Sequence, residues 1–211
     1  MSDEIAFYHN PMSRGRMVHW MLEEVGASYR VELINLEKGE QKKPAYLAVN
    51  PMGKLPAISH RGTVVTETGA ICAYLADAFP AAGLAPAIGA AKRGRYLRWM
   101  FFGAGCLDAA LVDRMLARPA PERTGALGYG RYEDVMNVLE QALTPGPYFL
   151  QDQFSAADVY VGSQIGWGLM MKTLEPRPAF QAYMGRLAQR PAFRRVNEQS
   201  EQLAARLKAA G

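Results

Sequence analysis

The segment Asn50-Pro51-Met52-Gly53-Lys54-Leu55-Pro56 stands at the centre of the pattern that decides the fold. Its two prolines and its glycine interrupt regular secondary structure. Directly after it, Pro56 to His60 and Thr63 to Thr66 are rich in strand formers and flank the turn Arg61-Gly62, which predicts a β-hairpin. A helix is predicted next, over Glu67 to Phe79, because apolar residues recur there at helical spacing.

The residues before this segment predict a second set of elements. Ile5 to His9 predicts a strand, Ser13 to Val25 a helix and Tyr29 to Ile34 another strand. A polar loop over Glu37 to Lys43 and a short helical turn around Tyr46-Leu47 follow. The order is β-α-β-(α)-β-β-α, with a right-handed crossover joining the first two, parallel strands. Such a mixed sheet with helices on its faces is the thioredoxin arrangement, so residues 1–80 are predicted to form a thioredoxin-like α/β domain.

The remainder of the chain carries helical signals. Residues 81–90 are rich in proline and glycine and are predicted to be a linker. Residues 91–211 are predicted to form an all-α domain, in which Ser155 and Asp158 have the spacing of a helix-capping box. We assign this pair to folding and not to chemistry. The segments with helical periodicity are 91–117, 122–143, 155–171, 178–189 and 191–209.

Composition excludes several classes of function. The 211 residues are 49% hydrophobic and 21% charged, as in an ordinary globular protein, and no run approaches the roughly 18 apolar residues of a membrane span. The first residues lack the features of a signal peptide, so a cytoplasmic protein is expected. The net charge of +4 comes without interleaved basic and aromatic residues, so no nucleic-acid partner is expected. The two cysteines and three histidines show no ligand spacing, so we expect no metal and no bound cofactor. The absence of a C-x-x-C pair argues against a dithiol oxidoreductase.

Four segments, in order and spread over almost the whole chain, resemble the glutathione transferase family, and the length resembles its bacterial members. The resemblance implies the glutathione transferase fold, with glutathione as a co-substrate and a homodimer in which the third and fourth helices of two subunits meet. The segments are Phe7-Tyr8-His9-Asn10-Pro11-Met12-Ser13-Arg14-Gly15-Arg16, Asn50-Pro51-Met52-Gly53-Lys54-Leu55-Pro56, Glu67-Thr68-Gly69-Ala70-Ile71-Cys72-Ala73-Tyr74-Leu75 and Phe154-Ser155-Ala156-Ala157-Asp158.

The resemblance implies that glutathione binds to the second and third of these segments. Pro56 resembles the family's cis-proline, which would leave the backbone of Leu55 free to pair with the cysteinyl part of glutathione like an added strand. Glu67 and Thr68 would stand at a helix N-terminus, where amides and the helix dipole favour the γ-glutamyl carboxylate. Thr68 would add a hydroxyl donor, and Glu67 would pair with the α-ammonium group. An ordinary turn proline and a plain helix cap are the alternatives.

Two lysines are placed by the resemblance near the glycine carboxylate of glutathione. Lys54 would meet that carboxylate, and Lys42 or its neighbour Lys43 would assist from the preceding loop. For any single lysine, a solvated surface charge is the alternative.

The group that activates the thiol is not decided by the sequence. Family members use a tyrosine, serine or cysteine near the end of the first strand, and this chain offers Tyr8, Asn10 and Ser13. Compared with cysteine-type bacterial members, Ser13 falls on the cysteine. Compared with serine-type members, Asn10 falls nearer the serine. A helix N-cap is the alternative role for Ser13.

The resemblance implies an enzyme of detoxification that conjugates reduced glutathione to hydrophobic electrophiles through an activated thiolate. Met12 and Phe102 are candidates for the pocket of the electrophile. Three other functions stay open: a non-catalytic binding or regulatory module with the same fold, a glutathione-dependent peroxidase, and an isomerase.

Overall fold

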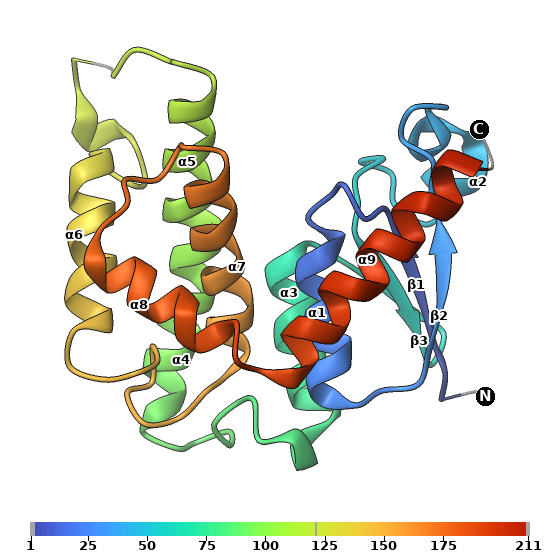
Figure 1. Ribbon diagram of the computed structural model, residues 1–211, viewed down its shortest axis with the longest axis horizontal. Coiled ribbons are helices and arrows are strands. Elements are labelled where there is room, and N and C mark those ends of the chain that lie inside the picture. Colours follow the sequence, from blue (N-terminus) through green and yellow to red (C-terminus); the bar gives the residue numbers. More distant parts are fainter. Residues whose placement is uncertain (1–2, 121, 210–211) are drawn as a thin grey trace. The chain divides into compact units, whose positions relative to one another are not determined.

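The computed structural model describes residues 3–120 and 122–209 (Figure 1). Its contacts divide the chain into two compact units. The first unit contains the chain up to Ala82 together with the segment from Arg190 onward, and the second unit contains Gly83–Gln189. Sequence periodicity groups residues 91–211 as one helical domain, whereas the contacts of the last helix group it with the first unit. No helix within the described residues is both long and apolar enough to cross a membrane.

The sheet of the first unit has the predicted topology, with the strand order β2-β1-β3-β4. Strands β1 and β2 are parallel, and the pairs β1–β3 and β3–β4 are antiparallel. Four of the five residues of β1 are buried, so this strand is the centre of the core. The strand bounds are Ile5–His9 for β1, Tyr29–Leu33 for β2, Ala57–His60 for β3 and Thr63–Thr66 for β4.

Helices accompany the sheet in the predicted positions. Helix α1 spans Gly15–Val25 and ends at Gly26, whose positive φ of 67° suits a glycine at a helix end. Helix α2 spans Pro44–Leu47, and helix α3 spans Thr68–Ala78. The predicted helix after β1 began at Ser13, two residues before α1 begins, because Ser13 and Arg14 form the turn that leads into it.

The last helix, α9, spans Pro191–Ala209 and lies beside α1 (Figure 1). The indole of Trp20 meets the ring of Phe193 edge-on, with 4.9 Å between centroids. The guanidinium of Arg190 donates to both carboxylate oxygens of Glu24, each at 2.6 Å. Aromatic packing and partly buried charge pairing therefore attach α9 to the first unit.

The elements assigned to the described part of the second unit are helices, as predicted, but two boundaries differ from the prediction. The predicted helix over 91–117 is broken by a π-helical turn over Gly103–Leu107. The predicted helix over 122–143 begins only at Tyr132, because the glycine-rich residues before it form a short 3₁₀ turn and a loop in which Gly130 has a φ of 70°. The helix bounds are Lys92–Phe102 for α4, Asp108–Met115 for α5, Tyr132–Leu143 for α6, Ala156–Met170 for α7 and Pro178–Leu187 for α8.

The predicted capping box at the start of α7 is confirmed. The carboxylate of Asp158 accepts the backbone N–H of Ser155 at 2.9 Å and, through its other oxygen, the N–H of Phe149 at 3.0 Å. It also accepts the hydroxyl of Tyr183, at 2.8 Å. Because Asp158 is fully buried, these donors replace water around its charge and tie α8 and a loop to the start of α7.

Candidate functional site

Three of the segments singled out by the sequence meet at one edge of the sheet. Ala57, the first residue of β3, pairs with Tyr8 near the end of β1 and with Thr66 at the end of β4. Tyr8, Ala57 and Thr66 therefore form one row across the sheet. The segments that follow β1, precede β3 and follow β4 all connect to the sheet at this row. The topology thus brings together the sites predicted at Tyr8, at Leu55-Pro56 and at Glu67-Thr68.

The Leu55–Pro56 peptide bond is cis, as expected. Pro56 is buried and Leu55 is half-buried. The residue before them is held through its backbone, because the carbonyl of Lys54 accepts the hydroxyl of Tyr46 at 2.6 Å and the side-chain amide of Asn50 at 2.8 Å. These two buried anchors fix the backbone at the position where the added-strand pairing is predicted.

The two predicted lysines lie on the surface near this backbone. The side chain of Lys54 is exposed to solvent. The ammonium of Lys42 donates to the carbonyl of Met52 at 2.9 Å, so the loop before α2 folds back toward the segment that carries Lys54. The positive charges of Lys42 and Lys54 therefore belong to two segments that contact each other.

Helix α3 begins in an unusual conformation. Glu67, the residue before it, has φ 66° and ψ 117°, and no side chain caps the helix start. A positive φ in a residue with a Cβ costs about 1–3 kcal/mol and is concentrated at functional sites. Thr68 is the first residue of the helix and is 9% exposed. The N–H groups of the first turn, which lack a side-chain partner, form a seat for an anion.

The turn between β1 and α1 carries Asn10 and Ser13, and both side chains are engaged within it. The amide nitrogen of Asn10 donates to the carbonyl of Ile34 at 2.8 Å, and its amide oxygen accepts the N–H of Met12 at 2.9 Å. The hydroxyl of Ser13 donates to the carbonyl of Asn10 at 2.7 Å and accepts the N–H of Gly15 at 3.0 Å. Since a hydroxyl has one proton to donate, Ser13 acts here as a cap and would need to rotate to bind a thiolate.

Tyr8 and the two candidates for the electrophile pocket have different surroundings. Tyr8 is half-buried, and its ring meets that of Tyr46 edge-on at 5.8 Å. Met12 is 74% exposed beside the turn that holds Ser13. Phe102 belongs to α4 in the second unit, where its ring meets that of Trp99 at 5.3 Å. The structure brings Tyr8 and Met12 into the same unit, and the role of Phe102 stays a prediction.

A residue without a predicted role, His9, lies beneath the start of α1. Its ring is fully buried, stacks on Phe7 at 4.7 Å, and has neither nitrogen hydrogen-bonded within residues 3–120 and 122–209. Burial, reinforced by the charges of His19 and Arg16, lowers the pKa of His9 to about 3. A Cβ on Gly15 would run into Nδ1 of His9, so this neutral ring sets the position of the helix start. The apolar strand around His9 is a weak signal of its burial, and no pattern in the sequence indicates its contact with Gly15.

Comparison with known proteins identifies the family. Residues 4–77 match the family model described as "Glutathione S-transferase, N-terminal domain". Over 177 residues, the chain is 30% identical to glutathione S-transferase A of Pleuronectes platessa, covering 79% of this chain and 78% of that protein. The chain belongs to the glutathione S-transferase family.

Two further relatives extend this result. The disulfide-bond oxidoreductase YfcG of Escherichia coli K12 is 28% identical over 200 residues, which cover 89% of this chain and 92% of that protein. The structure of a sphingomonad glutathione S-transferase complexed with glutathione is 30% identical and superposes with a TM-score of 0.76, covering 93% of this chain and 98% of that one. The thioredoxin-like first part and the helical second part thus form the glutathione transferase fold.

Proposed function

We propose that this glutathione transferase binds reduced glutathione on the first unit, ionises its thiol and transfers the glutathionyl group to an electrophilic carbon. The observation that carries the proposal is the row of paired residues Tyr8, Ala57 and Thr66. This row puts a backbone for strand addition, an uncapped helix start and the thiol-activating candidates at one edge of the sheet. The glutathione bound to the sphingomonad relative supports the same ligand here.

Each part of glutathione has a matching group. The backbone of Leu55, held in place through the anchors on Lys54, would pair with the cysteinyl residue. The uncapped amides at Thr68 would bind the γ-glutamyl carboxylate, while the carboxylate of Glu67 would bind the α-ammonium group. Lys54, assisted by Lys42, would bind the glycine carboxylate.

Thiol activation requires only modest stabilisation of the thiolate. A free thiol has a pKa of about 8.5, and lowering it by about two units requires about 2.7 kcal/mol. A hydrogen bond to a charged acceptor contributes about 1.5–3 kcal/mol, and a helix N-terminus about 0.3–1 kcal/mol. Ser13 would supply the bond by turning its proton from the carbonyl of Asn10 to the sulfur. The second N–H of the Asn10 side chain and the hydroxyl of Tyr8 are the competing donors.

The thiol proton would leave to solvent before the transfer. The thiolate sulfur would then form a bond to a carbon that bears a halide, to a ring carbon of an epoxide, or to the β-carbon of a conjugated carbonyl compound. The electron pair would leave with the halide, pass to the epoxide oxygen, or pass to the carbonyl oxygen as an enolate. Solvent would then protonate the alkoxide or the enolate. Bringing the two substrates together would supply much of the rate. Met12 and Phe102 remain the proposed contacts of the electrophile, and a homodimer remains the proposed assembly.

A second candidate function follows from the relative named as a disulfide-bond oxidoreductase. Here the same thiolate would attack a disulfide sulfur, forming a mixed disulfide and releasing the other sulfur as a thiolate. A second glutathione would then release the substrate thiol and leave as oxidised glutathione. This chemistry needs no cysteine from the protein, because glutathione supplies both reducing thiols.

The decisive experiment is a titration of bound glutathione, following thiolate absorbance against pH. Wild type is compared with Ser13→Ala, Asn10→Ala and Tyr8→Phe, and with Ser28→Ala, an exposed serine before the opposite end of the sheet, as a control. In wild type we expect the pKa of the bound thiol to lie about two units below the free value. Among the variants, only Ser13→Ala should return this pKa to the free value. If glutathione binds to wild type and its thiol pKa is unchanged, the protein is a non-catalytic binding module.

Two turnover assays separate the candidate reactions. One measures conjugation of glutathione to 1-chloro-2,4-dinitrobenzene, and the other measures reduction of hydroxyethyl disulfide by glutathione. Conjugation that exceeds disulfide reduction supports the transferase. Disulfide reduction without conjugation supports the function of a disulfide-bond oxidoreductase instead.

A further inference from the structure

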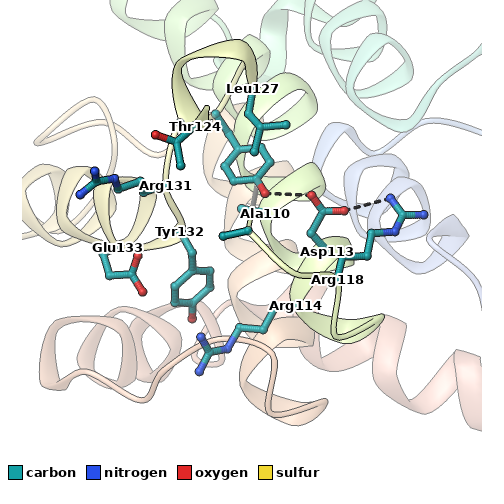
Figure 2. A pocket seen from close by; sticks show the side chains of 12 residues that line it. Ala110, Asp113, Arg114, Arg118, Thr124, Leu127, Arg131, Tyr132 and Glu133 are labelled. Atoms are coloured by element: carbon teal, nitrogen blue, oxygen red, sulfur yellow. Dashed lines mark hydrogen bonds and ion pairs between the residues drawn. The ribbon is translucent and has the colours of Figure 1, made fainter. Parts of the chain in front are cut away.

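The imidazole of His9 is fully buried, and in the part of the chain that the structure describes neither of its nitrogens has a hydrogen-bond partner. Asp113 in the second unit shows the usual arrangement, because its carboxylate accepts the guanidinium of Arg118 at 3.0 Å and the hydroxyl of Tyr129 at 2.8 Å (Figure 2). A buried polar group without a partner lowers the stability of a fold. An apolar side chain would suit the core better at this position, so the imidazole of His9 calls for a functional explanation.

The ring of His9 is fixed to the end of β1. The backbone carbonyl of His9 accepts the N–H of Ile34 at 2.9 Å, which continues the pairing of β1 with β2. The ring stacks on Phe7 with 4.7 Å between centroids and meets the ring of His19 edge-on at 5.4 Å. Burial is the main cause that lowers the pKa of His9 to about 3, so the ring is uncharged at neutral pH. The sheet therefore presents a fixed, neutral ring to the element that packs against it.

That element is the start of α1. The ring edge formed by Nδ1 and Cε1 of His9 faces Gly15, the first residue of the helix. A Cβ on Gly15 would collide with Nδ1 and would lie 3.1 Å from Cε1, so the helix backbone lies directly against the ring. A neutral imidazole carries one hydrogen on its two nitrogens, and a nitrogen without hydrogen allows a closer approach than the C–H edge of a phenyl ring. The ring therefore sets how closely the start of α1 approaches the sheet.

Ser13 contacts the same glycine from the turn before the helix. Its Oγ accepts the N–H of Gly15 at 3.0 Å and would lie 3.0 Å from a Cβ added to Gly15. The hydroxyl of Ser13 also donates to the carbonyl of Asn10 at 2.7 Å. Gly15 is buried, whereas Ser13 is half-buried and lies nearer the surface. A series of contacts thus leads from the sheet through the ring of His9 and the backbone of Gly15 to the hydroxyl of Ser13.

We propose that His9 is a positioning residue for thiol ionisation, which acts through Gly15 to hold the hydroxyl of Ser13 where it can bind the sulfur of glutathione. This inference rests on the proposed function, with Ser13 as the donor to the thiolate. Hydrogen bonds weaken steeply as their geometry departs from the optimum, so a small shift of the helix start changes the stabilisation of the thiolate. The proposed seats for the rest of glutathione, at Leu55 and Thr68, belong to other segments. A change at His9 should therefore alter thiol ionisation and leave the binding of the rest of the ligand intact.

The test measures the pKa of the bound thiol and the affinity for the rest of the ligand separately. Thiolate absorbance is followed against pH for glutathione bound to wild type, His9→Phe, Ser13→Ala and the double variant. Phenylalanine removes the unpaired nitrogens and presents a larger edge to Gly15. Calorimetric titration with S-methylglutathione, which has no ionisable thiol, measures the binding of the rest of the ligand. His60→Phe is the matched control, because His60 is also buried and ends β3 at the opposite end of the sheet, where it pairs with Thr63.

We expect His9→Phe to raise the pKa of the bound thiol by about one unit toward the free value. Its affinity for S-methylglutathione should stay within about twofold of that of wild type. Adding His9→Phe to Ser13→Ala should change the thiol pKa no further, because the ring acts through the serine hydroxyl. An independent effect would be visible in this double variant, since burial can also raise a thiol pKa above its free value. His60→Phe should leave the thiol pKa at the wild-type value.

Two results would overturn the positioning role and leave the proposed function standing. One is a lowered thiol pKa in wild type that His9→Phe does not change, and the other is an equal rise with and without the hydroxyl of Ser13. A wild-type thiol pKa at the free value would instead remove the proposed function together with this inference. If circular dichroism shows that His9→Phe does not fold, Gly15→Ala changes the same contact from the helix side and carries the same expectations.

Discussion

Nε2 of His19 lies 2.9 Å from the phenolic oxygen of Tyr29, and this contact determines which nitrogen of His19 carries the proton. Tyr29 donates its single hydroxyl proton to Glu23 at 2.7 Å, so it can only accept from His19. Neutral His19 therefore carries its proton on Nε2. A second proton would have to enter at Nδ1, which is buried. A side-chain hydrogen bond with Gln199 favours the protonated ring, but the effect of burial is larger.

The first prediction is a loss of stability in mild acid. Burial is the main cause that lowers the pKa of His19 to about 4 and that of His9 to about 3, against 6.5 for an unperturbed histidine. Between pH 6.5 and these values, the unfolded chain binds protons that the folded chain does not. The stabilisation is therefore complete above pH 6.5 and is lost as the pH falls through the folded values, by up to about 1.4 kcal/mol per pH unit for each histidine.

Urea unfolding at several pH values between 7.5 and 4.5 measures this slope. His19→Gln should unfold with a shallower dependence on pH than wild type, because one of the two histidines no longer titrates in the unfolded chain. If His19→Gln and wild type lose stability in parallel, another group is responsible for the acid sensitivity.

The second prediction concerns the start of α1. In Gly15→Ala the added methyl would run into the ring of His9, which is confined between Phe7 and His19. We expect a loss of about 1–3 kcal/mol in the free energy of unfolding, measured with urea. Gly94→Ala is the control, because nothing lies within 4 Å of the added methyl in α4, and helix propensity predicts a gain of about 0.5–1 kcal/mol there. Similar gains in both variants would show that His9 moves aside freely.

The third prediction separates stability from binding at Glu67. Glycine adopts a positive φ without strain, so Glu67→Gly should raise the free energy of unfolding by about 1 kcal/mol. The same substitution removes the carboxylate proposed for the α-ammonium group, so the affinity for glutathione should fall by about tenfold or more. Urea unfolding and calorimetric titration with glutathione measure the two effects. A variant that is more stable and binds glutathione as well as wild type would remove Glu67 from the site.

The fourth prediction concerns the capping box of α7. Asp158→Ala leaves the N–H groups of Phe149 and Ser155 and the hydroxyl of Tyr183 buried without their acceptor. We expect a loss of about 3 kcal/mol or more in thermal or urea unfolding, because each such donor costs about 1–3 kcal/mol. Tyr183→Phe removes one donor together with its need for an acceptor and should cost only about 1 kcal/mol. Equal losses in the two variants would contradict this account of the box.

Local signals in the sequence predicted the strands and the start of α7 well. Strands β1 and β4 have the predicted bounds, Ile5–His9 and Thr63–Thr66, because apolar or β-branched residues are enclosed there by turn formers. The break at Gly103 could not be predicted in this way. A Cβ at Gly103 would approach Tyr160 to 2.9 Å, so the break is related to close packing against α7, a contact between residues far apart in the sequence.

The candidate site shows the same division. The residue types around Pro56 and Thr68 indicated their positions, and the cis bond is observed. The hydrogen bonds of the β1–α1 turn were not predictable, because the amide of Asn10 binds the carbonyl of Ile34 on the neighbouring chain segment. The proton donor for the thiol therefore stays a prediction among Ser13, Asn10 and Tyr8.

The attachment of α9 to α1 sets an order for folding during synthesis. The first unit is encoded in two pieces, separated by roughly a hundred residues that form the second unit. At a translation rate of about 5–20 residues per second, the ribosome needs about 5–20 seconds to make that insertion. Throughout this interval the surface of α1 around Trp20 lacks its contact with Phe193, while the helices of the second unit can already pack against one another. The half of the protein that is made first is therefore completed last.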